Sequence, residues 1–185
     1  MSRFDDSDLT RNAFLGGQLQ LWQPRNGYRA GVDPVFLAAC VPAREGQGVL
    51  ELGCGAGTAI LSLAVRVPGL RLHGAELQPA YAQLAQRNAA DNQVDLHVTC
   101  ADLNDLPAEL RAQQFDHVIA NPPYYRAGAH TGAADPGRRT ALGETTPLRD
   151  WIDAATRRLT HKGYLHVIQR ADRLPDLLAA CDDRL

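Results

Sequence analysis

A glycine-rich turn between an apolar run and a helical pattern constrains the fold more than any other feature of the sequence. Residues 48–52 are apolar except for Glu51 and predict a buried strand. Three glycines follow at alternate positions, and residues 58–67 then have the pattern of a helix that Pro68 stops. Because glycine permits tight backbone geometry and the close approach of a ligand, this strand–turn–helix unit predicts a binding loop.

Strands and helices alternate along the rest of the chain. Further strands are predicted at residues 70–75, 94–100, 115–120 and 164–169. Helices are predicted at residues 33–41, 79–92, 103–113, 147–162 and 174–181. The polar residues 1–12 are expected to fray. This order is typical of an α/β fold with a mainly parallel sheet and helices on both faces, whose ligands bind beyond the carboxyl ends of the strands.

Length, net charge and cysteine spacing limit the kinds of protein that this sequence can encode. The 185 residues are expected to form one domain, 1–185, with an N-terminal segment at 1–45 and a core at 46–185. The formal net charge of -2 gives no overall electrostatic footprint for nucleic acid, so such a partner needs a local basic patch. The four cysteines form no C-x-x-C pair, and neither a secretory signal nor an 18-residue apolar stretch is present. We therefore expect a cytoplasmic protein without a metal site or a membrane span.

Acidic residues stand at the ends of the first three predicted core strands. Glu51 lies just before a G-x-G-x-G turn, whereas dinucleotide-binding loops have the spacing G-x-G-x-x-G. A carboxylate there repels a pyrophosphate and attracts a cationic amino group. Glu76 can accept both hydroxyls of a ribose, and Asp102 can accept an adenine amino group. The plain alternatives are a structural turn, a solvated glutamate and a helix N-cap, but the three acids together fit an adenosine that carries a charged amino acid.

The sequence Asn121-Pro122-Pro123-Tyr124, here called the Asn-Pro-Pro-Tyr motif, directly follows the fourth predicted core strand. Proline fixes the backbone and removes donors, so the neighbouring carbonyl oxygens are held as acceptors. The Asn121 side-chain oxygen and the Pro122 carbonyl can accept from one NH2 group, while Tyr124 offers a face for stacking. Two such acceptors favour the pyramidal, nucleophilic nitrogen of a transition state, so no strong base is needed. The alternative is a plain proline-rich turn.

These segments resemble the N6-adenine and N5-glutamine methyltransferases that share the Asn-Pro-Pro-Tyr motif. Other segments are similar to bacterial tRNA1(Val) N6-adenine methyltransferases, which modify the adenine next to the anticodon; they are Leu15-Gly16-Gly17, Gln23-Pro24, the run from Tyr28 to Asp33, and Glu76-Leu77-Gln78. The similarity covers nearly the whole chain and is more specific for the class of enzyme than for the substrate. It implies a Rossmann-like class I methyltransferase fold and S-adenosylmethionine as the methyl donor.

The resemblance also implies roles for individual residues. The cofactor-binding residues are expected to be Tyr28, Arg29, Gly31, Glu51, Gly53, Gly55, Glu76, Asp102, the Leu103 backbone and Asn121. The catalytic residues, which hold the target, are expected to be Asn121, Pro122, Pro123 and Tyr124. A contact between Arg29 and the carboxylate of the cofactor is our own hypothesis, and a plain surface arginine is its alternative.

Basic residues follow the motif in a stretch rich in glycine, alanine and proline. Arg126, Arg138 and Arg139, with Tyr124, are the predicted substrate-binding residues, because arginines can contact phosphates even in an acidic chain. The stretch is expected to be a mobile flap beside the target, with a solvated loop as the alternative. The predicted substrate is tRNA, with the adenine flipped or already looped out.

The sequence predicts fewer strands than methyltransferases of this fold usually have. Methyltransferases of this fold resemble one another in having seven strands, the last two in a hairpin, but only five core strands are predicted before Leu185. The chain is therefore expected to be truncated, with residues 164–169 as an exposed edge open to self-association.

The other candidate functions are glutamine N5-methylation of release factors, disfavoured by the short N-terminal segment, and guanine N2-methylation of ribosomal RNA, whose enzymes usually carry phenylalanine in place of Tyr124. A non-catalytic module that binds the cofactor or RNA is the non-enzyme alternative.

Overall fold

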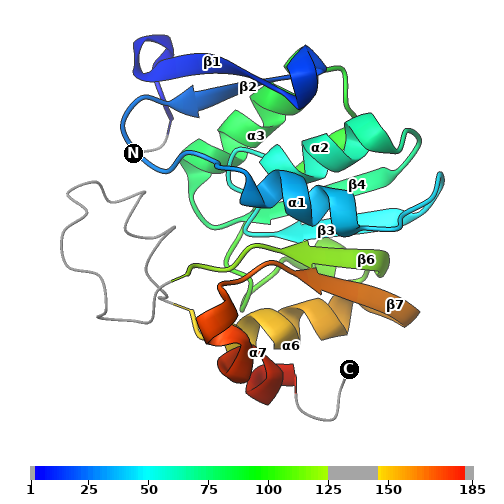
Figure 1. The fold of residues 1–185 in the computed structure, drawn as a ribbon. Coiled ribbons are helices and arrows are strands. Elements are labelled where there is room, and N and C mark those ends of the chain that lie inside the picture. Colours follow the sequence, from blue (N-terminus) through cyan, green and yellow to red (C-terminus); the bar gives the residue numbers. More distant parts are fainter. Residues whose placement is uncertain (1–2, 125–145, 182–185) are drawn as a thin grey trace.

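The computed structural model describes residues 3–124 and 146–181, and its centre is a parallel five-stranded sheet (Figure 1). The strand order is β5-β4-β3-β6-β7. The strands are β3 (Gly48–Leu52), β4 (Arg71–Glu76), β5 (Leu96–Cys100), β6 (Phe115–Ala120) and β7 (Leu159–Val167). The chain builds outwards from β3 to β5 and then returns to the other side of β3 as β6. This reversal between β3 and β6 is the point at which parallel sheets of this kind bind ligands.

Helices cover both faces of the sheet, as predicted (Figure 1). One face carries α1 (Asp33–Cys40), α2 (Thr58–Arg66) and α3 (Pro79–Asp91). The other carries α4 (Ala108–Arg111), α6 (Leu148–Arg158) and α7 (Leu174–Cys181). Short 3-10 turns are η1 (Asp6–Asp8), η2 (Leu15–Gly17) and η3 (Ala171–Arg173). Among the described residues, no helix combines the length and the apolar composition that crossing a membrane requires.

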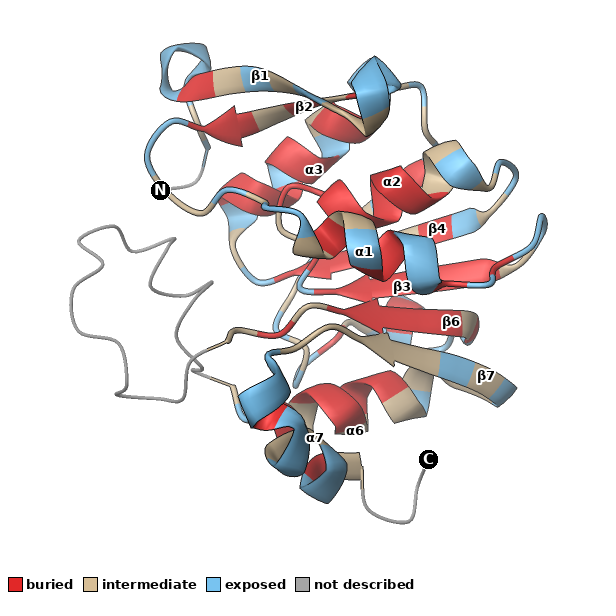
Figure 2. Ribbon diagram, in the orientation of Figure 1, coloured by how far each residue is buried: buried red, intermediate tan, exposed pale blue. Residues whose placement is uncertain are grey.

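The central strand β3 is buried along its whole length (Figure 2). Val49 belongs to the core cluster beneath α1 and α2, whereas Leu50 belongs to the cluster beneath α6. A strand that is covered on both faces needs apolar residues at successive positions rather than at alternate ones. The prediction of a buried strand at residues 48–52 is therefore confirmed, and Glu51 is the polar exception within it.

An antiparallel hairpin precedes the core, so the expectation that residues 1–12 fray is wrong for most of that segment. Its strands are β1 (Leu9–Phe14) and β2 (Leu19–Pro24). Leu9, Leu19 and Leu21 are buried against the rest of the molecule. Apolar and polar residues alternate over too few positions here for the sequence pattern to predict the strands. Burial against α3 stabilises them.

Asn88 of α3 and Asn92, which caps the carboxyl end of that helix, take the place of a neighbouring strand along β2. Asn88 Oδ1 accepts from the backbone N–H of Trp22 at 2.7 Å, and its Nδ2 donates to the Trp22 carbonyl at 3.1 Å. Asn92 pairs with both backbone groups of Gln20 in the same way, at 2.9 and 2.7 Å. The two asparagines lie four residues apart on one helix face, so their amides continue the ladder along the open edge of the hairpin.

Two predicted boundaries differ from the structure. The helix expected at 103–113 is reduced to α4, since residues 102–105 form a turn. The helix expected to end at Lys162-Gly163 ends at Arg158, and β7 begins at once. Lys162 has φ +64° and lies in an irregularity between the pairs Phe115–Leu159 and His117–Tyr164. The Lys-Gly signal therefore marks a bulge in a strand, where left-handed backbone is also used.

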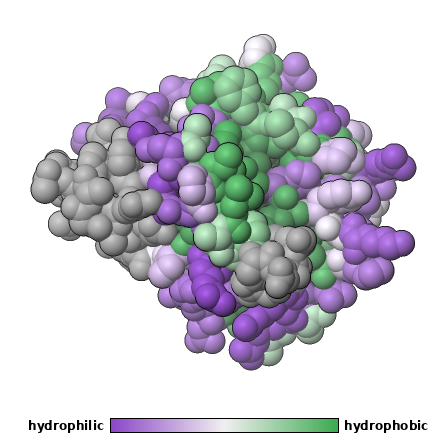
Figure 3. All heavy atoms as spheres, turned by 60° about the horizontal axis from the view of Figure 1, so that its bottom comes forward, coloured by the Kyte–Doolittle hydropathy of each residue, from purple (hydrophilic) through white to green (hydrophobic). Residues whose placement is uncertain are grey.

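Within the described residues β7 pairs only with β6 and forms one edge of the sheet. Tyr164 on this strand is 61% exposed, and Leu178 of α7 is 63% exposed. In Figure 3 the bottom of Figure 1 is turned towards the viewer. Apolar side chains form a band across the face in view. The predicted edge strand is confirmed in place, although it begins earlier than expected.

Candidate active site

A cavity lies at the carboxyl ends of the central strands, where the strand order reverses. Most of the cofactor-binding residues predicted from the sequence line it; they are Tyr28, Glu51, Gly53, Gly55, Glu76, Asp102, Leu103 and Asn121. Pro123 is also in its wall, whereas Arg29, Gly31, Pro122 and Tyr124 are not. Arg126, Arg138 and Arg139 lie outside the described residues. The fold therefore brings together predicted cofactor-binding residues as far apart in sequence as Tyr28 and Asn121, which are separated by 93 positions and both line the cavity.

The glycine loop after β3 depends on backbone conformations that only glycine adopts easily. Gly53, Gly55 and Gly57 have φ of +65°, +54° and +84°. A Cβ on Gly53 would lie 2.5 Å from Cη2 of Trp151, whereas a Cβ on Gly55 would meet nothing within 4 Å. The loop is thus tight at its first glycine, where α6 packs against it, and open at its second, where a ligand can approach.

Replacing Gly53 by alanine should destabilise the cofactor-free protein far more than the same change at Gly55. Both variants place a Cβ in left-handed backbone, which costs about 1–2 kcal/mol. Only Gly53→Ala also forces the Trp151 ring to move, so we expect a total loss of about 2–4 kcal/mol in the free energy of unfolding. Urea titration of both variants without cofactor measures the difference. Equal losses would show that the contact with Trp151 does not restrict the loop.

Glu51 is buried near the carboxyl end of β3, beside the start of α2. It is 3% exposed, and its Oε2 accepts from the backbone N–H of Ile60 at 3.0 Å. Burial raises the Glu51 pKa to about 8, the Ile60 hydrogen bond opposes this rise, and the nearby Glu76 adds to it. Among the ion pairs of residues 3–124 and 146–181, none involves Glu51 or Glu76. Two buried carboxyl groups without a counter-charge are arranged to receive a cation.

Glu76 ends β4 and braces the glycine loop. Its Oε2 accepts from the backbone N–H of Gly55 at 2.9 Å, and its Oε1 accepts from Gln78 at 2.8 Å. Burial raises the pKa of Glu76, and the backbone hydrogen bonds from Gln78 and Gly55 oppose that rise. Each carboxylate oxygen can accept more than one hydrogen bond, so both remain able to bind two neighbouring hydroxyls. The ribose contact stays a prediction.

Asp102 lies in the turn after β5. It is exposed, and its Oδ1 accepts from the backbone N–H of Asn104 at 2.9 Å. The alternative of a helix N-cap does not apply, because α4 begins only at Ala108. Leu103 beside it is partly buried against the cluster beneath α6 and lines the cavity. The pair offers a polar acceptor next to an apolar surface, which is what a flat heteroaromatic ring requires.

Asn121 directly follows β6 and lies in the wall of the cavity. Its side-chain Oδ1 is buried and has no hydrogen-bond partner among the described residues. Leaving a buried acceptor unpaired costs about 1–3 kcal/mol, so such atoms are rare in folded proteins. Because Asn121 also lines the cavity, its oxygen is placed to accept from a bound group.

Tyr124 links the Asn-Pro-Pro-Tyr motif to the start of α1. Its hydroxyl donates to Oδ2 of Asp33 at 2.5 Å. Burial raises the pKa of Tyr124, and the hydrogen bond to Asp33 adds to the rise. The backbone at Tyr28 is held as well, since its N–H donates to the Tyr81 hydroxyl at 2.8 Å. The run from Tyr28 to Asp33, one of the segments that resemble the family, is therefore linked at Asp33 to the motif and at Tyr28 to α3.

Arg29 has other contacts than the one hypothesised from the sequence. Its Nη1 donates to the Pro24 carbonyl and to Thr10 Oγ1, both at 2.8 Å, and its Nη2 donates to Asn12 Oδ1 at 2.9 Å. The guanidinium thus fastens residues 28–31 to the N-terminal hairpin and does not line the cavity. In this arrangement Arg29 holds the segment against the hairpin, and its contact with a cofactor carboxylate stays a prediction.

Trp151 is a cavity residue that the sequence did not reveal. It resembles any apolar residue in the helical stripe of α6, yet it is only 8% exposed and lines the cavity beneath Gly53. Its Nε1 is buried without a hydrogen-bond partner among the described residues. Within the same part of the chain, no group of three or more His, Cys, Asp and Glu side chains is arranged to hold a metal ion.

Residues 30–180 match the family model described as Methyltransferase small domain. A curated relative from Porphyromonas gingivalis (strain W83) is 32% identical over 180 residues, which are 91% of this chain and 69% of the relative, and its name is tRNA1(Val) (adenine(37)-N6)-methyltransferase. The chain belongs to the tRNA1(Val) methyltransferase family. A family member from Actinobacillus succinogenes is 30% identical over 88% of this chain and 69% of its own length. A second Porphyromonas gingivalis strain (ATCC 33277) carries a member that is 34% identical over 80% of this chain and 61% of its own length, so the chain spans 61% to 69% of these three relatives.

Solved structures confirm the fold expected for a tRNA1(Val) methyltransferase family member. A predicted O-methyltransferase from Agrobacterium tumefaciens is 28% identical, with a TM-score of 0.61 over 81% of this chain and 67% of that one. The Thermus thermophilus 16S rRNA N2 G1207 methyltransferase, solved with AdoMet and guanosine, has a TM-score of 0.66 over 93% of this chain and 45% of that one. At 19% identity the second structure supports the fold alone. The predicted Rossmann-like class I methyltransferase fold is therefore confirmed.

Proposed function

We propose that the chain is an S-adenosylmethionine-dependent N-methyltransferase that methylates the exocyclic N6 of an adenine in tRNA. The observation that carries the proposal is the buried Oδ1 of Asn121, which has no partner among the described residues, in a cavity where the same residues provide no counter-charge for two carboxyl groups. The names of the relatives support the choice of tRNA and of adenine N6.

The chemistry of the cavity fits the proposed cofactor. S-adenosylmethionine carries a sulfonium and an ammonium cation, a ribose with two hydroxyls and a flat adenine, and when bound it supplies an electrophilic methyl group. Glu51 is proposed to attract the cationic end and Glu76 to accept from the ribose. Asp102 and the Leu103 backbone are proposed to hold the adenine, and the open side of Gly55 leaves room for the ligand.

The Asn-Pro-Pro-Tyr motif is proposed to prepare the nitrogen for attack. The lone pair of an exocyclic amine is delocalised into the ring, so the amine is a weak nucleophile. Asn121 Oδ1 and the Pro122 carbonyl are proposed to accept its two hydrogens and to favour the pyramidal nitrogen of the transition state. Tyr124, whose hydroxyl is fixed by Asp33, remains the proposed stacking surface. The substrate is thus activated mainly by positioning.

The remaining partners and the location are proposals of the same kind. Arg126, Arg138 and Arg139 are proposed to contact the phosphates of tRNA. A tRNA substrate places the protein in the cytoplasm, where tRNA is modified. The exposed edge of β7 is proposed as a surface for self-association, because unpaired strand edges readily pair with another chain.

A labelling experiment over three classes of acceptor tests the proposed function. The chain would be incubated with methyl-labelled S-adenosylmethionine and, separately, with unmodified bulk tRNA, ribosomal RNA and release factors. We expect label in tRNA alone. Label in release factors but not in tRNA would overturn the substrate assignment in favour of glutamine methylation. Tight cofactor binding without transfer to any acceptor would instead indicate a binding module.

A further inference from the structure

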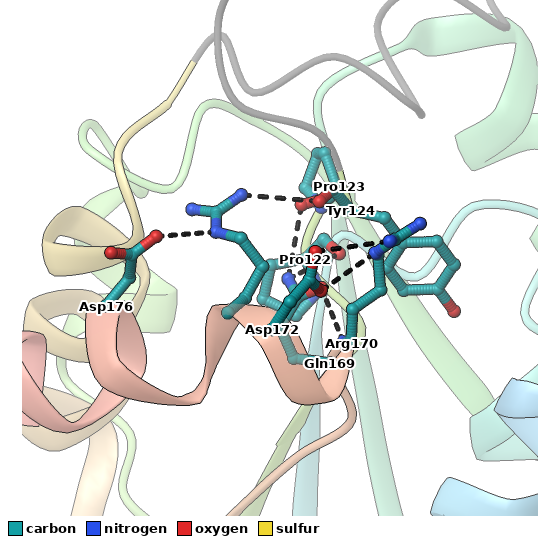
Figure 4. Close-up of polar contacts among 8 residues, drawn as sticks. Pro122, Pro123, Tyr124, Gln169, Arg170, Asp172 and Asp176 are labelled. Carbon is teal, nitrogen blue, oxygen red and sulfur yellow. Dashed lines mark hydrogen bonds and ion pairs between the residues drawn. The ribbon is translucent and has the colours of Figure 1, made fainter. Parts of the chain in front are cut away.

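Three consecutive backbone carbonyls of the Asn-Pro-Pro-Tyr motif accept hydrogen bonds from one short segment after β7 (Figure 4). Gln169 Nε2 lies 3.4 Å from the Pro122 carbonyl oxygen and 3.2 Å from that of Pro123. Arg173 Nη1 donates to the Tyr124 carbonyl at 3.3 Å. Pro122 and Pro123 have no backbone N–H, so at these two positions the carbonyl is the one backbone group that can form a hydrogen bond.

The orientation of the Gln169 amide follows from its other contact. Its Oε1 accepts from the backbone N–H of Arg170 at 2.9 Å. A flipped amide would place this oxygen against the carbonyls of Pro122 and Pro123, where acceptor faces acceptor, and would leave the Arg170 N–H facing an NH2 group. The amide nitrogen has two hydrogens, so one side chain can serve both carbonyls.

Arg173 is built into the same turn. Its side chain is only 7% exposed, and its Nε donates to Asp176 Oδ2 at 2.8 Å, which balances its charge. Arg170 and Asp172 form a two-pronged ion pair at 3.0 and 3.1 Å beside it (Figure 4). The pair with Asp176 involves the buried Arg173 side chain and therefore holds its Nη1 donor in place before any ligand arrives.

The register of the sheet explains why these donors meet the motif. β7 runs parallel to β6, and Ala120 lies opposite Val167. The N–H of Ile168 still donates to the Ala120 carbonyl at 3.1 Å. Continuing this register beyond the strands places Asn121 opposite Ile168 and Pro122 opposite Gln169, which brings the Gln169 side chain to the Pro122 carbonyl.

We propose that Gln169 and Arg173 form a clamp that positions the Asn-Pro-Pro-Tyr motif for its target. The proposal rests on the proposed methyl transfer to an NH2 group. A carbonyl oxygen has two lone pairs, so Gln169 occupies one on Pro122 and leaves the other for the target nitrogen. Gln169 thereby sets the direction from which Pro122 accepts, and both residues act through the motif rather than on the substrate.

Two variants of Gln169 separate positioning from folding. Gln169→Leu removes the donor, and single-turnover transfer at saturating cofactor should fall about 10-fold or more at every pH, because small misplacements of a reacting group are costly. Gln169→Glu keeps the acceptor for Arg170. Its carboxylate repels the two carbonyls, whereas its protonated form donates to them, so its rate relative to wild type should rise as the pH is lowered towards the ordinary range of a glutamate, about pH 4–5. Cofactor affinity should stay within about twofold in both, since Gln169 does not line the cavity.

Gln113→Leu is the matched control, because Gln113 is exposed and donates to the Glu109 carbonyl at the far end of α4. A second readout needs no turnover. The side-chain NH2 signals of Asn121 in a nitrogen–proton NMR spectrum should shift in Gln169→Leu and not in Gln113→Leu. If the wild type methylates no acceptor while these signals shift, the proposed function fails and the clamp stands. If the wild type is active and Gln169→Glu matches Gln113→Leu at every pH, the clamp is overturned.

Discussion

Asn121→Ala should abolish methyl transfer while leaving most of the cofactor affinity. The variant removes the only buried side-chain oxygen of the Asn-Pro-Pro-Tyr motif that lacks a partner in the described structure. Removing one preorganised polar contact to a transition state typically lowers kcat by about 100-fold to 1000-fold. Single-turnover transfer to tRNA measures the rate, and calorimetric titration with S-adenosylmethionine measures the affinity.

Asn26→Ala is a suitable control for this variant, because Asn26 is exposed and lies outside the cavity. It should behave as wild type in both measurements. Turnover retained by Asn121→Ala would mean that Asn121 does not hold the target. A parallel collapse of rate and cofactor affinity would instead place Asn121 on the cofactor, which the sequence also allowed.

Glu51→Gln should stabilise the cofactor-free protein at alkaline pH while weakening cofactor binding. In the folded chain the Glu51 pKa is raised from 4.5 to about 8, chiefly by burial. Between these two values the folded state holds a proton that the unfolded state has lost, so the free energy of unfolding falls as pH rises through this window. At about 1.4 kcal/mol per pKa unit the loss is on the order of a few kcal/mol above pH 8. Glutamine carries no charge to bury and keeps an acceptor for Ile60, so it avoids this loss.

Chemical denaturation at pH 6 and pH 9 tests the stability half of this prediction. The free energy of unfolding of the variant should increase relative to that of wild type as the pH rises. A difference that stays the same at both pH values would show that the Glu51 pKa is not raised in the folded protein. The binding half follows from the same charge. Wild type must release the Glu51 proton to receive a cation, so its affinity for S-adenosylmethionine should rise towards pH 8. The variant should bind at least about 10-fold more weakly, with little dependence on pH from this group.

The sequence predicted the parts of the site that depend on local pattern and parallel topology. Glu51, Glu76 and Asn121 each lie at or next to the carboxyl end of a strand, and parallel strands place these ends at one edge of the sheet. Predicting each strand was therefore enough to predict that these residues lie close together. The same rule placed Asp102 and Leu103 in the cavity wall, although the helix expected after them is mostly a turn.

Other features were missed because they depend on contacts between distant segments. The N-terminal hairpin is stabilised by the side-chain amides of Asn88 and of the α3 cap Asn92, which lie 66 and 72 residues from their partners, and no local sequence pattern indicates such pairing. Trp151 and Gln169 have side chains that are common in helices and strand ends, so only their packing shows their surroundings. The hypothesis for Arg29 was based on its being the lone arginine of its segment, whereas three acceptors on the hairpin determine its position.

The identity of the methylated nucleoside tests the central claim most directly. Bulk tRNA labelled by the chain and methyl-labelled S-adenosylmethionine would be digested to nucleosides and separated by chromatography with mass detection. We predict that the label is found in N6-methyladenosine, and that Asn121→Ala yields none. Label in N2-methylguanosine, or in any nucleoside methylated on carbon or oxygen, would contradict the account.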